Sequence, residues 1–371
     1  MNQKLKVMIA GGGTGGHIYP ALGIAKALEA ISPGTQIFFV GTDQGMETKV
    51  IPKQGYELFL VQGGKLNLSG RWKEKLLTLL KLPVGLLQSF FLILRHKPNY
   101  VLGVGGYASG PFVLVASLCG IPTGIWEPNA HPGLANRWLS RFVRDCFLVF
   151  EEAKSYLAAR RYMVEGMPVR REIEEAFQKS SAASAVSSPQ FRILCFGGSQ
   201  GSRVINNALF RLLEEGRDFS GVHLVHQIGS ADWLDFQRKY QALKKPAGFD
   251  VDAREFIFDM PEQYQKADLV ICRGGASTLA EVAAFGVPPI VIPLPAADNH
   301  QERNAEALEK SCGATLILQK DLTSDRLYAA ILAIKKDQER RLKISQSLRI
   351  FFRPNAAQRI AESIVKGTEK L

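Results

Sequence analysis

Both halves of the chain carry the same local pattern: an apolar run, then a glycine-rich turn, then a helix-like segment. The two clearest copies are KVMIAGGGTGGHIYPALGIAKAL, beginning at Lys6, and FRILCFGGSQGSRVINNALFRLL, beginning at Phe191. A short apolar run bounded by glycines predicts a buried strand, and apolar residues three and four positions apart predict a helix. Strand, turn and helix in this order begin a βαβ unit, so the pattern predicts parallel sheets covered by helices.

Similar apolar runs alternate with helical patterns along all 371 residues, a length that suits two domains. Strands are predicted at 6–10, 36–40, 101–104, 123–126, 146–150, 191–196, 222–227, 255–258, 269–272, 289–293 and 315–318. We expect an α/β protein of two Rossmann-like domains, residues 1–165 and 166–350, that face each other across a cleft. The crossing is placed near Gly166 and Pro168.

Composition narrows the class of protein. With 46% hydrophobic and 22% charged residues the chain is globular, and its five cysteines are scattered without a CxxC pair. Buried, reduced thiols in a cytosolic protein are the expected reading. No signal peptide is predicted, because Lys4 and Lys6 lead straight into the first strand.

The net charge of +11 indicates an anionic partner: phosphates, an acidic membrane or nucleic acid. Basic and aromatic residues are not interleaved as in proteins that bind single strands, so no nucleic-acid partner is expected. A solvated basic surface without a partner is the plain alternative.

The segment between Arg71 and Lys97 is rich in Leu and Phe and has basic residues at both ends. A transmembrane helix needs about 20 apolar residues. Lys81 and Pro83 interrupt this segment, so two short helices are predicted. They either pack on the sheet or, as we favour, lie on an anionic bilayer.

Four glycine-containing turns follow predicted strands, at 11–17, 103–111, 197–202 and 272–281. Such a turn aims backbone N–H groups and the positive end of a helix dipole at a phosphate, although tight packing alone also explains a single glycine turn. A dehydrogenase would carry an acid at the end of its second strand, but here that strand ends in Gly41 and Asp43 comes late. Several turns together fit a ligand with more than one phosphate.

A more specific pattern runs through nearly the whole chain. The motifs GGTGGH, GGYASGP, NAHPGLANR, GMPVR, GGSQG, EFIFDM, ICRGGASTLAE and DNHQERNA occur in one order. The chain resembles the bacterial MurG family, the UDP-GlcNAc: lipid I N-acetylglucosaminyltransferases of peptidoglycan synthesis. The resemblance implies the GT-B architecture of two Rossmann-like domains, with a C-terminal helix, residues 351–371, that packs back on the N-terminal domain.

The resemblance also implies a donor site for UDP-GlcNAc. The backbone of Ile257 would hold the uracil, Glu281 the two ribose hydroxyls, and Asn129 and Gln301 the GlcNAc hydroxyls. The diphosphate would face Arg170, Ser199 and the turn formed by Ala276, Ser277, Thr278, Leu279 and Ala280, and the family's donor contacts include Thr14, Gly15 and Gly16. Acceptor contacts are implied at Gly13, Gly105, Gly106 and Tyr107. One departure is WEPN, at 126–129, where the family often has HEQN.

The implied reaction inverts the anomeric centre, so it needs a base on the attacking hydroxyl and a stabilised leaving diphosphate. His17 is the favoured base, because an imidazole near the positive end of a helix dipole stays neutral and can accept a proton. Glu127 is the second candidate. A histidine that only caps its helix is the alternative for His17.

No cofactor or metal is expected. Asp250 and Asp252 match the DxD pattern of metal-dependent transferases, but they lie in a polar stretch and not at the end of an apolar strand. The implied product is lipid II, made at the cytoplasmic face of the plasma membrane by a peripheral enzyme, with cell-wall synthesis proteins as further partners. The alternative within the class is another lipid glycosyltransferase with a diacylglycerol acceptor.

Overall fold

The computed structural model describes residues 4–63, 72–180, 190–244, 248–296 and 298–368, with the side chains of 72–81 and 180 left out. Contacts between residues divide the chain into two units. The first runs from Met1 to Arg170 and takes up the chain again from Asn355, and the second runs from Arg171 to Pro354.

The first unit is built on a parallel sheet of seven strands in the order β3-β2-β1-β4-β5-β6-β7. Its strands are β1 (Lys6–Gly11), β2 (Gln36–Gly41), β3 (Glu57–Leu60), β4 (Tyr100–Gly105), β5 (Thr123–Glu127), β6 (Asp145–Leu148) and β7 (Arg161–Val164). Its helices are α1 (Gly15–Ile31), α2 (Glu47–Lys53), α3 (Trp72–His96), α4 (Ser109–Leu118), α5 (Leu134–Leu139), the 3-10 helix Glu151–Tyr156 and α14 (Ala356–Thr368).

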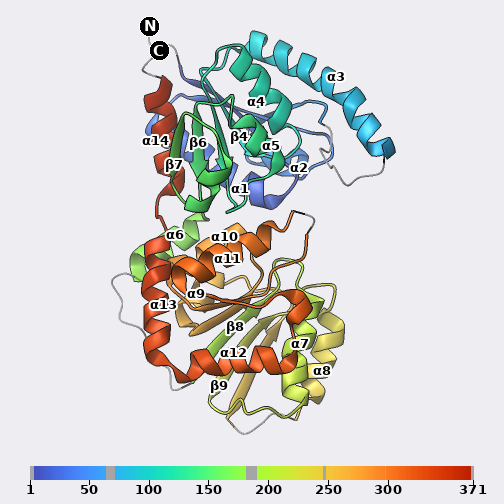
Figure 1. Cartoon of the computed structure of the whole chain (residues 1–371), viewed down its shortest axis with the longest axis vertical. Helices are drawn as coiled ribbons and strands as arrows, with labels where there is room; N and C mark the ends of the chain where they lie inside the picture. The colour runs from blue at the N-terminus through green and yellow to red at the C-terminus, as the bar shows by residue number, and fades with distance from the viewer. Residues whose placement is uncertain (1–3, 64–71, 181–189, 245–247, 297, 369–371) are drawn as a thin grey trace. The chain divides into compact units, whose positions relative to one another are not determined.

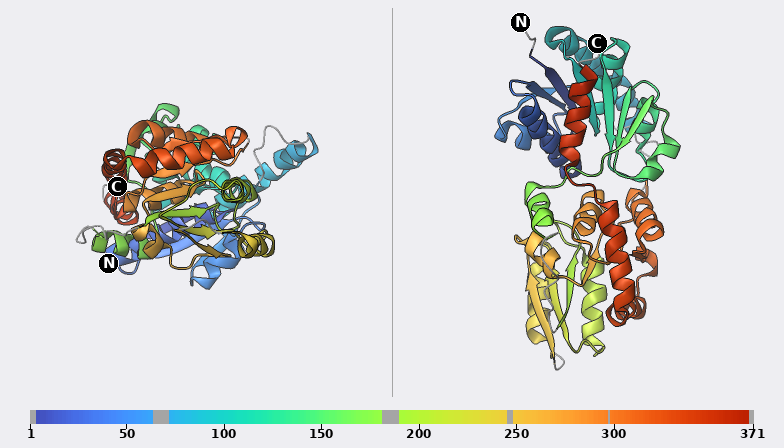
Figure 2. Two further views of the ribbon diagram at one scale, coloured as in Figure 1. Left: turned by 90° about the horizontal axis from the view of Figure 1, so that it is seen from below. Right: turned by 90° about the vertical axis from the view of Figure 1, so that its left-hand side faces the viewer.

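The last helix of the chain belongs to the first unit. α14 packs beside α1, as the red helix in Figure 2 shows. Two arginines hold it there: Arg144 donates to the carbonyl of Gly367 at 2.9 Å, and Arg359 donates to the carboxylate of Glu165 at 2.7 Å. The sequence predicted that this C-terminal helix begins at residue 351. In the structure Phe351 is the last residue of α13, in the second unit.

The second unit has a parallel sheet of six strands in the order β10-β9-β8-β11-β12-β13. The strands are β8 (Phe191–Phe196), β9 (Val222–Gln227), β10 (Phe249–Arg254), β11 (Leu269–Cys272), β12 (Pro289–Val291) and β13 (Thr315–Leu316). The helices are α6 (Arg171–Ser180), α7 (Arg203–Glu214), α8 (Trp233–Ala242), α9 (Met260–Lys266), α10 (Ala276–Phe285), α11 (His300–Cys312), the 3-10 helix Gln319–Asp321, α12 (Ser324–Lys336) and α13 (Gln338–Phe351). Figure 1 labels most of these elements and confirms the predicted α/β fold with two Rossmann-like sheets.

Three strand predictions differ from the structure. The edge strand β10 covers 249–254, and the stretch predicted as a strand, 255–258, is the loop that follows it. β3 and β7 were missed. All three pair with one neighbour only and are largely half-exposed, so they lack the continuous apolar run that marks a strand buried on both faces.

The prediction of two short helices between Arg71 and Lys97 is wrong. α3 is one helix with Pro83 inside it. The second half of α3 packs closely against Gln62. Gly85 has no room for a Cβ, which would lie 2.1 Å from the carbonyl oxygen of Gln62. The side chain of Gln88 accepts from the N–H of Gln62 at 2.7 Å. Such packing outweighs the one helical hydrogen bond that a proline removes.

Candidate active site

In each sheet the strand order reverses once, and the sequence-predicted turns follow the strands on either side of that point. In the first sheet the reversal lies between β1 and β4, and in the second between β8 and β11. Loops at the carboxyl ends of two such strands diverge to opposite faces of the sheet and leave room for a ligand. All four glycine turns singled out in the sequence therefore adjoin a switch point.

In the first unit the turns after β1 and β4 touch each other. The N–H of Gly12 donates to the carbonyl of Gly105 at 3.1 Å. Gly106, at a φ of +86°, sits so close that a Cβ would lie 2.6 Å from the carbonyl oxygen of Gly12. Only glycine fits this approach. Tyr107 follows on the same turn with an exposed ring.

His17 stands in the first turn of α1, and its ring lies over the turn after β4. A Cβ added to Gly105 would lie 2.7 Å from the ring atom Cε1 and 2.9 Å from Nδ1. The backbone N–H of His17 donates to the carbonyl of Thr14, the residue that precedes the helix. The first turn of α1 holds no acidic residue, so its positive end faces the turn without a neutralising side chain from the helix itself. The structure thus brings His17 beside the predicted acceptor residue Gly105.

A buried carboxylate that the sequence did not reveal supports the first glycine turn. Glu47, 1% exposed, accepts from the N–H of Gly13 at 2.7 Å and from the N–H and hydroxyl of Thr42, both at 3.0 Å. Gly12 and Gly45 leave no room for a Cβ beside this side chain. The N–H of Gly13, a predicted acceptor contact, is therefore directed at Glu47.

Glu127 ends β5 and is almost completely buried. One oxygen accepts from the N–H and side-chain amide of Asn129 at 2.9 and 3.2 Å, and the other accepts from Gly133 and Asn136 at 3.2 and 2.9 Å. Burial raises the pKa of Glu127, and these hydrogen bonds oppose the rise. Because its carboxylate accepts four hydrogen bonds, Glu127 stabilises the conformation of the loop that carries Asn129.

The second unit repeats the arrangement with different supports. Ser202 is the N-cap residue directly before α7, and its hydroxyl accepts from Arg273 at 2.6 Å. Arg273 is buried at the end of β11 and also donates to the carbonyls of Ile292 and Pro293 at 3.0 and 3.2 Å. Burial lowers the pKa of this guanidinium. One cation therefore ties the turn after β8 to the segment after β12.

The predicted diphosphate turn is the first turn of α10. The helix starts after Gly275 and has no acidic residue in its first turn, so its free N–H groups keep their positive potential. Ser199, on the neighbouring turn, is exposed. Arg170 is also exposed and is the last residue of the first unit before the chain enters the second.

Glu281 lies one turn further along α10 and is half-buried. It accepts from the hydroxyl of Tyr264 at 3.2 Å. The side-chain oxygen of Gln301, the predicted sugar contact, accepts from the N–H of Leu294 at 3.0 Å. Its side-chain NH₂ group would be the part that donates to a sugar hydroxyl.

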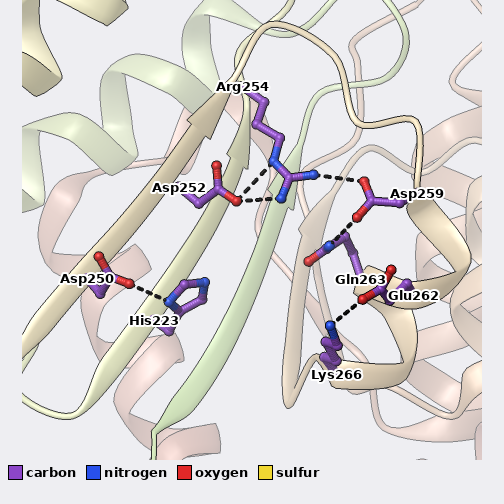
Figure 3. A network of polar contacts seen from close by, with 8 residues as sticks. All are labelled: His223, Asp250, Asp252, Arg254, Asp259, Glu262, Gln263 and Lys266. Carbon is purple, nitrogen blue, oxygen red and sulfur yellow. Dashed lines mark hydrogen bonds and ion pairs between the residues drawn. The ribbon is translucent and has the colours of Figure 1, made fainter.

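The loop after β10 carries Ile257, the predicted uracil contact. Its N–H donates to the side-chain oxygen of Gln227 at 2.9 Å. A uracil ring bound here would either share this N–H with Gln227 or bond to the carbonyl of Ile257. Arg254 closes the ends of the loop, because it bonds Asp252 at 2.5 Å and Asp259 at 2.8 Å (Figure 3). Burial raises the pKa of Asp259, but the hydrogen bond from Gln263 and the charge of Arg254 outweigh it and lower that pKa.

The DxD pair lies on the largely half-exposed edge strand β10, which the sequence did not predict as a strand. Asp250 bonds the ring of His223 at 2.9 Å, and Asp252 bonds Arg254 (Figure 3). Among the described residues, no group of three or more His, Cys, Asp or Glu side chains could hold a metal ion.

Known proteins match this chain over nearly its whole length. The glycosyltransferase family 28 N-terminal domain matches residues 7–148, and the family's C-terminal domain matches residues 192–360. A Bdellovibrio bacteriovorus protein called UDP-N-acetylglucosamine–N-acetylmuramyl-(pentapeptide) pyrophosphoryl-undecaprenol N-acetylglucosamine transferase is 49% identical over 99% of this chain and 100% of its own length. The Myxococcus xanthus protein of the same name is 40% identical over 97% of this chain and 92% of its own.

Among solved structures, Acinetobacter baumannii MurG matches with a TM-score of 0.80 at 29% identity, over 98% of this chain and 99% of that one. The chain belongs to the MurG family. Within this MurG-family site the sequence had singled out the turns and the residues on them. It had not singled out Glu47, Gln227 or Tyr264, which bond Gly13, Ile257 and Glu281. Arg273 lies within the turn 272–281 that the sequence had marked, but its bond to Ser202 was not foreseen. In each case the partner lies 17 or more residues away in the chain, so no local pattern predicts the contact.

Proposed function

We propose that this protein is an inverting glycosyltransferase that moves GlcNAc from UDP-GlcNAc to the 4-hydroxyl of lipid I and thereby forms lipid II for peptidoglycan synthesis. The observation that carries the proposal is the full-length identity of 49% to a relative named for this transfer. The two switch points, each lined by glycine turns, supply the kind of phosphate-binding loops that both substrates need.

We assign the donor mainly to the second unit. The start of α10 offers free N–H groups to the diphosphate, Glu281 offers a double acceptor to the ribose diol, and Gln301 offers an amide to the sugar. The exposed Arg170 adds positive charge for the leaving phosphates. Helix termini and arginine stabilise the diphosphate as it leaves, and the residues of this site require no cofactor for that step.

We assign the acceptor and the base to the first unit. The attacking hydroxyl of the acceptor forms a bond to the anomeric carbon as the bond to the UDP oxygen breaks, and His17 takes the hydroxyl proton. The ring of His17 is held against Gly105, which gives a proton acceptor a defined position. Glu127 is the weaker candidate, because its two oxygens already accept four hydrogen bonds.

The first unit also offers a surface for an anionic bilayer. The outer face of α3 exposes Val84, Leu87, Phe91 and Leu94 at helical spacing, with Leu87 58% and Phe91 60% exposed. Phe90 and the basic residues Arg95 and Lys97 adjoin this face. Leu86, which belongs to the segment for which the sequence favours bilayer contact, packs on the core instead. The side chains of Lys73, Lys75, Leu79, Leu80 and Lys81 and all of Arg71 lie outside the described residues.

Figure 1 shows α3 along the outside of the first unit, beside α4. In the part of the chain that the structure describes, no helix is long and apolar enough to cross a membrane. We propose that the exposed face of α3 rests on the cytoplasmic leaflet of the plasma membrane, where it brings the enzyme to its lipid acceptor and to other cell-wall synthesis proteins.

Transfer of labelled GlcNAc from UDP-GlcNAc to a short-chain lipid I analogue tests the proposed function. Product formation with this acceptor and none with diacylglycerol supports it, and the reverse result favours the alternative glycolipid synthase. UDP-glucose serves as the control donor, because it lacks the acetamido group. A fluorescence titration with NADH that saturates would instead favour a dehydrogenase.

A further inference from the structure

Gln227 is the last residue of β9 and joins two loops of the second unit. Its side-chain NH₂ group donates to the carbonyl of Gly198 at 2.9 Å, and its side-chain oxygen accepts from the N–H of Ile257 at 2.9 Å. The residue is only 4% exposed. One planar amide thus satisfies a donor in one loop and an acceptor in the other, which an apolar or a singly charged side chain of this size cannot do.

The backbone that follows Gln227 reinforces the junction. The N–H groups of Ile228 and Gly229 donate to Arg254 and Glu255, at 2.9 and 3.1 Å. On the other side, a Cβ on Gly201 would lie 1.9 Å from the carbonyl oxygen of Ile228. The segment 227–229 is therefore wedged between the turn 197–202 and the loop 254–258.

These two loops have different tasks in the proposed function. The turn 197–202 carries Ser199, assigned to the diphosphate, and the loop 254–258 carries Ile257, assigned to the uracil. The distance between base and diphosphate in UDP is set by its ribose. A protein that fixes the spacing of the two loops before binding avoids the entropic cost of ordering them when the nucleotide arrives.

We infer that Gln227 is a positioning residue that couples recognition of the uracil to recognition of the diphosphate. It touches neither group itself. The inference rests on the proposed function, because it requires UDP as the ligand of these loops. Because Gln227 holds the two loops at a fixed spacing, binding of the uracil in one loop favours binding of the diphosphate in the other. UDP therefore binds more tightly than either loop would bind its part of the nucleotide alone.

The test replaces Gln227 by methionine, which keeps the length of the side chain but loses both hydrogen bonds. Affinities for UDP, uridine and inorganic pyrophosphate are measured by calorimetry and by competition. We expect the dissociation constant for UDP to rise about tenfold, the size of one or two lost hydrogen bonds. Those for uridine and pyrophosphate should change less than about threefold, since each engages one loop. KM for UDP-GlcNAc should rise together with the dissociation constant for UDP. The kcat at saturating donor should stay within about twofold of the wild-type value.

Tyr240→Phe is the matched control. Tyr240 is buried in the same unit and bonds His226 at 2.8 Å, so its loss removes a buried hydrogen bond in which neither of the two loops takes part. It should lower the melting temperature and leave all three affinities unchanged. If Gln227→Met does not fold, Gln227→Glu keeps the shape and the acceptor but, when ionised, loses the donor to Gly198, and should show the same selective loss for UDP at pH 8.

Two results would overturn the inference: an unchanged UDP affinity in the Gln227 variants, or equal losses for UDP, uridine and pyrophosphate. Failure of the proposed function looks different. In that case the wild-type protein itself would neither bind UDP nor transfer GlcNAc, whatever the variants do.

Discussion

The hydroxyl of Tyr264 donates to a carboxylate oxygen of Glu281 at 3.2 Å, across the space between α9 and α10. The tyrosine is 1% exposed, and its ring stacks on Phe285 with centroids 5.3 Å apart. The ring of Phe196, at the end of β8, makes an edge-on contact with the Tyr264 ring, with centroids 6.1 Å apart. The carboxylate assigned to the ribose diol is thus oriented by a hydroxyl on a buried ring that packs against two other aromatic rings.

Replacing Tyr264 by phenylalanine should therefore weaken UDP binding by about 1 kcal/mol, the contribution of one hydrogen bond. Glu281→Ala should weaken UDP and UDP-GlcNAc alike, by about 2 kcal/mol. Because the hydroxyl acts through Glu281, the double variant should bind UDP as the Glu281→Ala variant does. Calorimetry with UDP measures this cycle, and additive losses would mean that the hydroxyl does not act through the carboxylate.

A methyl group at Gly105 should displace His17. The Cβ of an alanine there would lie 2.7 Å from the ring, and the φ of +98° already disfavours any side chain. Gly105→Ala should lower turnover by at least about tenfold and leave UDP affinity unchanged, since the UDP contacts proposed above lie mainly in the other unit. Gly110→Ala is the matched control, because its Cβ would meet nothing within 4 Å. Normal turnover in Gly105→Ala would show that the position of His17 does not matter.

His17→Ala should lower turnover by about 10²- to 10⁴-fold, the usual contribution of a positioned base. In the wild type the rate should fall as the pH drops through the pKa of the base, because the protonated ring cannot accept a proton. This acidic limb should vanish in His17→Ala. UDP affinity, measured by calorimetry, should persist.

Glu127→Gln is the counter-test for the base. An amide can accept with one end only, so one pair of donors, from Asn129 or from Gly133 and Asn136, would face an NH₂ group. We expect a lower melting temperature and reduced turnover with the acidic limb retained. If the limb vanishes here and stays in His17→Ala, Glu127 is the base.

The stability of the second unit should depend on pH through His226. This ring is completely buried, with Tyr240 at 2.8 Å on one nitrogen and Asn206 at 3.0 Å on the other. Burial lowers the pKa of His226 from 6.5 to about 3. Between these values the unfolded chain binds a proton that the folded chain does not, so stability falls as the pH falls and is fully retained above 6.5.

Urea unfolding at pH 7 and pH 5 measures this effect. The free-energy gap between the wild type and His226→Gln should narrow by about 2 kcal/mol over this interval, because the variant has no proton to bind at this position. The carboxylates common to both proteins cancel in the comparison. A gap that does not change with pH would mean that His226 titrates equally in both states.

Changing Leu87, Phe91 and Leu94 to serine together should reduce binding to vesicles of anionic lipid by at least about tenfold, since each residue would lose its burial in the bilayer. These side chains are exposed, so the melting temperature and turnover on a water-soluble acceptor should not change. Ile93→Ser is the contrasting control: Ile93 is 3% exposed, and its loss should lower the melting temperature. Vesicle binding equal to that of the wild type would show that the exposed face of α3 does not bind the membrane.

Much of the fold could be predicted because its signals are local. The strands β1, β4, β8 and β11 are largely apolar runs, and the glycine turns follow them directly in the chain. The edge strand β10 was missed because half-exposed strands need no apolar run. Pro83 suggested a helix break, yet the packing of Gly85 against Gln62 keeps α3 continuous.

By itself, the sequence determined two parallel sheets, the turns at their carboxyl ends and His17 on the rim of one turn, because these follow from residues adjacent in the chain. Only the tertiary structure decided which turns meet and what holds them. Glu47 lies 34 residues from Gly13, and Gln227 lies 30 residues from Ile257. The strand order determines these partners, because it brings segments that are distant in the chain to one edge of a sheet. A buried polar group takes whichever partner that edge supplies.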